Sequence, residues 1–179
     1  SWWGGIKDER QIPHTTMKDG VPNGYTIVTF DGQRYSIDYK AASLPADRQL
    51  HVYAPDEVSQ DQLADLKIIA NIYNGNEKSK VQLNLSTKGE SLGTVSMEQK
   101  AGVDPVYQQV YDRETAALAK ISDGERWMAL PAPRTTAHLW HSSVPADLSA
   151  GTYLITVLVE LENGSQYTAE RVLRVTGSK

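Results

Sequence analysis

The 179-residue sequence lacks cysteine, has only one phenylalanine and contains no long hydrophobic run. Without cysteine, disulfide bridges, thiolate zinc sites and cysteine nucleophiles are all excluded. No apolar stretch approaches the ~20 residues of a membrane helix, so we expect no membrane span. The formal net charge is -4 and no lysine–arginine cluster stands out, so we expect no nucleic-acid partner. The sequence starts at Ser1 and not at methionine, and we expect it to carry no signal peptide and to be a piece of a longer protein.

Strand patterns dominate what is present. Residues 25–30 and 33–39 are β-prone runs joined by Asp31-Gly32, which predicts a hairpin with a two-residue type I′ turn. Asn163-Gly164 predicts a second hairpin between residues 152–161 and 166–175. Alternating apolar positions predict further strands and their inward faces, namely Ile68, Ala70 and Ile72; Val81, Leu83 and Leu85; and Tyr153, Ile155, Val157, Val159 and Leu161.

One segment departs from the strand pattern. Asp104-Pro105 is a good helix start, because Asp caps the free N–H groups and Pro suits the first helical position. We expect a short amphipathic helix from there to residue 119, with Val106, Val110 and Ala117 on its apolar side, joined by Tyr107 and Tyr111. Residues 124–136 are expected to form a long connection.

Many short strands and one helix predict an all-β fold, an antiparallel immunoglobulin-like β-sandwich with one short inserted helix. Residues 1–24 show neither the alternation of a strand nor the apolar spacing of a helix, so we predict an irregular arm or interdomain linker there. Residues 25–176 are predicted to form the β-sandwich domain.

Catalytic and metal-binding patterns are weak. His138 and His141 are close in sequence, but at this spacing on a strand their side chains point to opposite faces. Acidic pairs such as Glu160 and Glu162 are better explained as solvated surface than as the two acids of a glycosidase. No serine nucleophile motif and no phosphate-binding glycine loop is present. We therefore predict no catalytic and no metal-binding residue in this chain.

The aromatic composition suggests a second kind of function. The sequence has nine tyrosines and four tryptophans but one phenylalanine. Tyr and Trp are common at partly solvent-exposed positions, such as protein interfaces and carbohydrate-binding surfaces. Tyr35, Tyr53 and Tyr73 are our candidates for a platform that binds carbohydrate or another ligand. The simpler interpretation is that most of these rings pack at the edge of the sandwich.

Six segments in chain order resemble the C-terminal domain of bacterial calcineurin-like phosphoesterases. They are DGVPNGYTIVTFDGQRYSIDYKAA (19–42), PADRQLHVYAPDEV (45–58), ANIYNGNEKSKVQL (70–83), DPVY at Asp104, HLWHSSVPADLSAGTYLITV (138–157) and YTAERVLRV (167–175). The leading SWWGG resembles the junction that follows the catalytic domain. The resemblance covers most of residues 1–175.

The resemblance implies that the chemistry lies in another domain. The family's catalytic domain binds two divalent metal ions through Asp-x-His, Gly-Asn-His and Gly-His-x-His motifs, and none of these occurs here. The chain would then be an accessory domain that contacts its own catalytic domain, with glycan or phosphoester contact as a further option. The resemblance also implies an exported, periplasmic bacterial parent. Our candidates for the interdomain contact are Trp2, Trp3, His14, Met17, Asp19 and Asn23.

Overall fold

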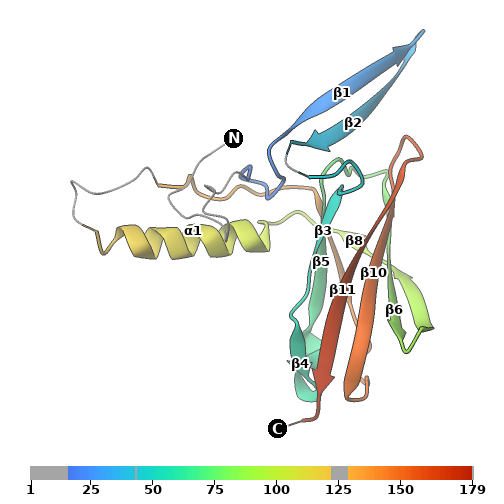
Figure 1. Cartoon of the computed structure of the whole chain (residues 1–179), viewed down its shortest axis with the longest axis vertical. Coiled ribbons are helices and arrows are strands. Elements are labelled where there is room, and N and C mark those ends of the chain that lie inside the picture. Colours follow the sequence, from blue (N-terminus) through green and yellow to red (C-terminus); the bar gives the residue numbers. More distant parts are fainter. Residues whose placement is uncertain (1–15, 43, 122–128, 179) are drawn as a thin grey trace.

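The computed structural model describes residues 16–42, 44–121 and 129–178, and the strands in these ranges form three sheets (Figure 1). A two-stranded sheet contains β1 (Gly24–Asp31) and β2 (Arg34–Ala41). A five-stranded sheet has the order β4 (Glu57–Ser59), β11 (Gln166–Thr176), β10 (Gly151–Glu160), β6 (Lys80–Thr87) and β7 (Glu90–Ser96). A four-stranded sheet has the order β3 (Leu50–Tyr53), β5 (Lys67–Ile72), β9 (Leu139–Ser143) and β8 (Glu98–Gln99).

The larger two sheets enclose the hydrophobic core. Residues at every second position point to the same side of a strand, and in β5, β6 and β10 these positions are buried. The core includes Ile68, Ala70 and Ile72 of β5, Val81, Leu83 and Leu85 of β6, and Tyr153, Ile155, Val157 and Val159 of β10, with Leu161 just after it. The predicted β-sandwich is confirmed, and so are the inward faces predicted from the alternation.

The helix also forms where the sequence predicts it. α1 (Pro105–Leu118) begins after Asp104, whose carboxylate accepts hydrogen bonds from the backbone N–H groups of Val106 and Tyr107. The predicted apolar side is partly wrong, because Val106 is 39% exposed while Tyr107 and Leu118 are buried. A short 3-10 helix, η1 (Gln60–Asp65), connects β4 to β5.

The first hairpin is present, but its turn differs from the prediction. Asp31 pairs with Arg34, so the two turn residues are Gly32 and Gln33 rather than Asp31 and Gly32. Gly32 has a φ of 60°, whereas Gln33 is not among the described residues with positive φ. A glycine alone at the first central position is typical of a type II′ turn, not of the predicted type I′ turn, which needs positive φ at both positions.

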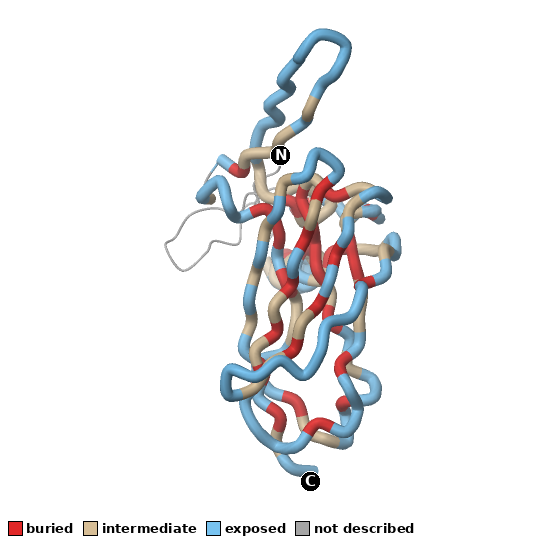
Figure 2. The backbone as a smooth tube through the Cα atoms, turned by 90° about the vertical axis from the view of Figure 1, so that its right-hand side faces the viewer, coloured by how far each residue is buried: buried red, intermediate tan, exposed pale blue. Residues whose placement is uncertain are grey.

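The hairpin formed by β1 and β2 also lies outside the sandwich. Its two strands form a sheet of their own, and they extend from one end of the sandwich into solvent (Figure 1). Figure 2 shows the buried segments in the sandwich, while the outer part of the hairpin is exposed. The expectation that the chain from Tyr25 onward builds the sandwich is therefore wrong for β1 and β2. The division at residues 24 and 25 itself remains a prediction.

Candidate functional site

A buried carboxylate joins four parts of the chain beside the four-stranded sheet. Asp104 is 1% exposed. Besides the two helical N–H groups, it accepts a hydrogen bond from the Tyr53 hydroxyl of β3 and one of 2.9 Å from the Asn71 amide of β5. The Asn71 amide also donates to the backbone oxygen of Asp19, at 2.9 Å. Helix, sheet and the chain leading into the hairpin thus meet at Asp104, which we call the Asp104 junction.

Gly20 is required by this junction. Its φ is 81°, a conformation that favours glycine. A Cβ atom at this position would lie 2.1 Å from the Asp104 carboxyl carbon. The backbone can therefore pass directly against Asp104 only because residue 20 has no side chain.

The base of the hairpin is tied to the sandwich by side chains. The Tyr39 hydroxyl donates to the backbone oxygen of Pro22, and the Gln49 amide donates to that of Tyr39 at 2.7 Å. The Asn74 amide donates to the Ile37 backbone oxygen at 2.8 Å, and the Asn163 amide to the Asp38 carboxylate at 3.1 Å. The bonds from Gln49, Asn74 and Asn163 come from three different loops of the sandwich, so they hold the direction in which the hairpin leaves it.

Tyrosines fill the space between the junction and the hairpin base. The rings of Tyr39 and Tyr73 lie edge to face, with centroids 6.3 Å apart. Burial, reinforced by the charge of Asp104, raises the pKa of Tyr73 to about 12 and raises that of Tyr53 still further. Both phenols are therefore neutral at physiological pH.

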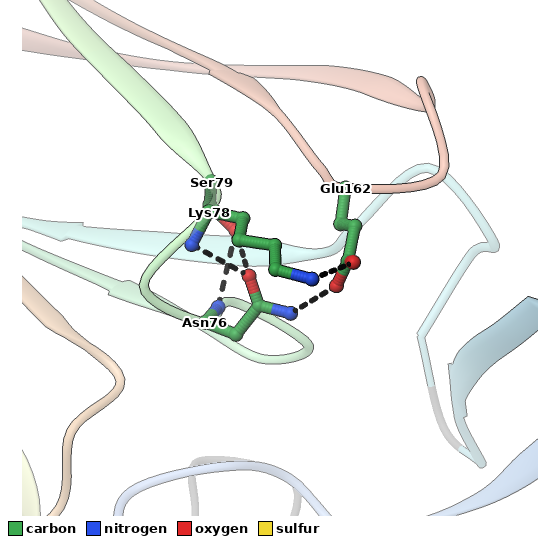
Figure 3. A network of polar contacts seen from close by, with 4 residues as sticks. All are labelled: Asn76, Lys78, Ser79 and Glu162. Atoms are coloured by element: carbon green, nitrogen blue, oxygen red, sulfur yellow. Dashed lines mark hydrogen bonds and ion pairs between the residues drawn. The ribbon is translucent and has the colours of Figure 1, made fainter.

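The loops beside the hairpin base are joined by a polar network (Figure 3). Glu162, after β10, accepts hydrogen bonds from Asn76 at 2.9 Å and from Lys78 at 2.5 Å. Asn76 also accepts from the backbone N–H of Lys78, at 3.0 Å. The hydrogen bond from Lys78 is the main cause of the lowered pKa of Glu162. This network connects the β5–β6 loop to the β10–β11 loop, and these loops also carry Asn74 and Asn163.

The predicted contact residues lie partly within the described ranges. Trp2, Trp3 and His14 fall outside them. Met17 and Asp19 lie in the short loop before the hairpin, where the Asp19 carboxylate accepts from the backbone N–H of Val21 at 3.1 Å. Asn23 precedes β1, and its backbone oxygen accepts from Ala42 at 2.9 Å. Their contact with another domain remains a prediction.

The three platform tyrosines are not brought together as an exposed row. Tyr35 is 66% exposed near the hairpin tip, Tyr53 is bound to Asp104, and Tyr73 is 8% exposed. The ligand-platform interpretation is therefore not favoured. Sequence reasoning missed that Tyr53 and Asn71 belong to the junction, because hydrogen-bond partners so distant in the chain leave no local pattern.

The histidines and acidic residues considered above do not converge either. His141 lies on β9, whereas His138 precedes that strand and is placed by a 3.1 Å hydrogen bond from its N–H to Thr136. Burial, together with nearby Lys100, lowers the pKa of His141. Glu160 accepts from Lys80 at 2.7 Å on the surface. Among the residues that the structure describes, no group of three or more His, Asp or Glu side chains is arranged to hold a metal ion, and no helix is long and apolar enough to cross a membrane.

Solved structures show only distant similarity to this fold. CopC from Methylosinus trichosporium OB3b is 12% identical with a TM-score of 0.38, and the match covers 72% of this chain and 92% of that one. Murine CRIg is 13% identical with a TM-score of 0.30, and the match covers 73% of this chain and 98% of that one. No curated protein matches the sequence.

A family model gives a much longer match. The family described as the C terminal of calcineurin-like phosphoesterase matches residues 1–167. That span includes the Asp104 junction, the hairpin, the helix and nearly the whole sandwich. The chain belongs to the family of C-terminal domains of calcineurin-like phosphoesterases.

Proposed function

We propose that this chain is a non-catalytic accessory domain that docks on the catalytic domain of its phosphoesterase and shapes the access of substrates to it. The family match supports the presence of a phosphoesterase domain in the same protein. The divalent metals and the hydrolysis of phosphoesters belong in this proposal to that domain, and the periplasmic location of the parent is part of the same proposal.

The observation that carries the proposal is the way in which the Asp104 junction holds the chain before the hairpin. Asp19 is hydrogen-bonded to Asn71, and Gly20 lies against Asp104. The bridge between Thr16 and Pro22 and the 2.8 Å bond from the Met17 N–H to the Val21 oxygen close the loop that precedes β1. The segment from Thr16 to Asn23 is therefore held at a defined place on the sandwich, beside the base of the hairpin.

Activity measurements test this proposal. With manganese or zinc added, this chain alone should not hydrolyse p-nitrophenyl phosphate or its diester. When this chain is removed from the two-domain parent, KM for a bulky phosphodiester should change more than KM for p-nitrophenyl phosphate, because only the larger substrate reaches the domain boundary. Metal-dependent hydrolysis by this chain alone, or identical kinetics of the parent with and without it, would overturn the proposal.

A further inference from the structure

The two faces of the β1–β2 hairpin have different chemistry. In an antiparallel pair, residues directly opposite each other point to the same side. Val28 lies opposite Ile37 and Phe30 opposite Tyr35, and the Phe30 and Tyr35 ring centroids are 6.4 Å apart. We call these four residues the apolar hairpin face. The other face holds Tyr25 and Ile27 together with four charged residues, Asp31, Arg34, Asp38 and Lys40.

The apolar hairpin face is in contact with water. Phe30 is 75% exposed and Tyr35 66%, while Val28 and Ile37 are 45% and 40% exposed. Aromatic side chains present on the order of 200 Å² each, so the face reaches on the order of 400 Å². That is the size of the largest apolar patch on a typical monomer, and such patches are often functional.

The face is held in place before any partner arrives. A two-stranded hairpin alone is marginally stable in water, but here Asn74 binds the backbone of Ile37 and Asn163 binds Asp38. A hollow of about 620 Å³ lies between β2 and these loops. Tyr35, Ile37 and Leu161 line part of it, and polar side chains that include Arg34 and Glu162 line the rest. A partner side chain inserted there would be enclosed by the hairpin on one side and by the sandwich on the other. Such preorganisation lowers the entropic cost of binding.

The size of the face argues against a second copy as its occupant. Two such faces packed together would bury on the order of 800 Å², whereas stable complexes of separate chains bury ~1,200–2,000 Å². Domains joined in one chain need less, because the linker gives a high effective concentration, and interfaces within a chain start at about 600 Å². The face thus fits a tethered domain better than a free partner.

Chain continuity indicates which domain that is. The described chain enters at Thr16, which bridges to Pro22, two residues before β1 begins. The family takes its description from the C-terminal position of this domain in phosphoesterases, so the catalytic domain connects on this side. The described chain thus begins beside the hairpin and not at the far end of the sandwich, where β10 begins and β11 ends (Figure 1).

We propose that the apolar hairpin face is the surface through which this domain packs on the phosphoesterase catalytic domain, an inference that rests on the proposed function. Phe30 and Tyr35 are the central side chains of the contact, and Val28 and Ile37 complete it toward the hairpin base. The hairpin acts as a preformed clamp that covers apolar surface of the catalytic domain.

Small-angle X-ray scattering of the two-domain parent tests the inference. The native protein should scatter as one compact particle. The double variant Phe30→Ser/Tyr35→Ser should show a larger radius of gyration and the signature of two domains moving independently. The matched control is Val95→Ser/Val172→Ser, which removes two apolar side chains that are 49% and 55% exposed on the five-stranded sheet. This control should scatter like the native protein. The Tm of this chain alone should not change in either variant, which separates lost docking from lost folding.

Three other results would overturn the inference. If both variants stay compact, the domain docks through another surface, which overturns this inference and leaves the proposed function standing. If the native two-domain protein is already extended, both are overturned. If this chain alone is dimeric by light scattering and Phe30→Ser/Tyr35→Ser makes it monomeric, the occupant is a second copy and the inference is wrong.

Discussion

Two hairpins of this protein have nearly the same sequence pattern and opposite surroundings. The β1–β2 and β10–β11 hairpins both alternate apolar and polar residues around a turn that contains glycine. β10 pairs with β11 on one side and with β6 on the other, and its inward side chains are between 0% and 6% exposed. β1 and β2 pair with each other, and none of their apolar side chains from Tyr25 to Ile37 is less than 40% exposed. The same local pattern thus builds the core in one place and an exposed surface in the other.

Alternation of apolar residues therefore predicts that a strand has an apolar face, but not which part of the protein will cover that face. The apolar face of β10 is covered by the opposite sheet of the same chain. In the hairpin we propose that the cover comes from another domain. The loops that place the hairpin contribute directional hydrogen bonds from Gln49, Asn74 and Asn163, and ring packing is limited to Tyr39 and Tyr73 at its base. The hairpin is consequently positioned by the sandwich without being buried in it.

A substitution in the buried β10–β11 hairpin should lower the free energy of unfolding far more than the same substitution in the β1–β2 hairpin. Ile155→Ala, at a position that is 0% exposed, should lower the free energy of unfolding of this chain by about 4 kcal/mol, because it leaves a cavity in the core. Ile37→Ala, the same change in the hairpin, should cost under about 1 kcal/mol, since surface positions contribute little. Urea unfolding measures both. Equal losses would mean that the β1–β2 hairpin belongs to the folded core, as β10 and β11 do, and would contradict the difference described above.

A somewhat smaller effect is expected at the connection between the two regions. Asp104→Ala removes the helix cap and leaves the buried Tyr53 hydroxyl and Asn71 amide without their acceptor. We expect a loss of about 3 kcal/mol in the free energy of unfolding. Asp112→Ala, an exposed change on the same helix, should stay within about 0.5 kcal/mol. A similarly small loss for Asp104→Ala would show that the junction does not hold the arm and helix to the sheet.

The smallest expected effect is a dependence on alkaline pH. The pKa of Tyr73 is raised from 10.0 to about 12, so folding favours its neutral form. Its contribution to stability is fully present below its ordinary pKa of 10 and is lost as the pH rises through about 12. The free energy of unfolding should therefore fall over this range, and the fall should be shallower in Tyr73→Phe. Tyr35→Phe, an exposed change near the hairpin tip, serves as the control. Should Tyr73→Phe and the native chain lose stability in parallel, Tyr73 does not titrate as a buried group.

Much of the fold follows from the sequence, for physical reasons that particular residues make clear. Ile155, Val157 and Val159 reveal their face because alternation is a local property of a strand, and Asp104-Pro105 reveals the helix start because capping is local too. The predicted turn at Asp31-Gly32 is one residue away from the observed turn at Gly32-Gln33, because both pairs of residues suit a tight turn.

What could not be predicted depends on partners that are distant in the chain. Asp104 was expected to cap the helix, but its bonds to Tyr53 and Asn71 join residues that are 51 and 33 positions away. Tyr53, Tyr73 and Tyr35 are similar in sequence context, yet only Tyr35 is well exposed. The sites were therefore less predictable than the strands, because a site depends on which elements meet and not on the pattern within each of them.

Amide hydrogen exchange of residues 24–41 shows whether the exposed hairpin becomes covered in the two-domain parent. In this chain alone, the hairpin should exchange far faster than residues 151–160 of β10, because its hydrogen bonds are exposed to solvent. In the two-domain parent, exchange in the hairpin should slow at least tenfold while β10 stays unchanged. Hairpin exchange at the same rate in this chain alone and in the parent would contradict the claim that the exposed hairpin is a docking surface.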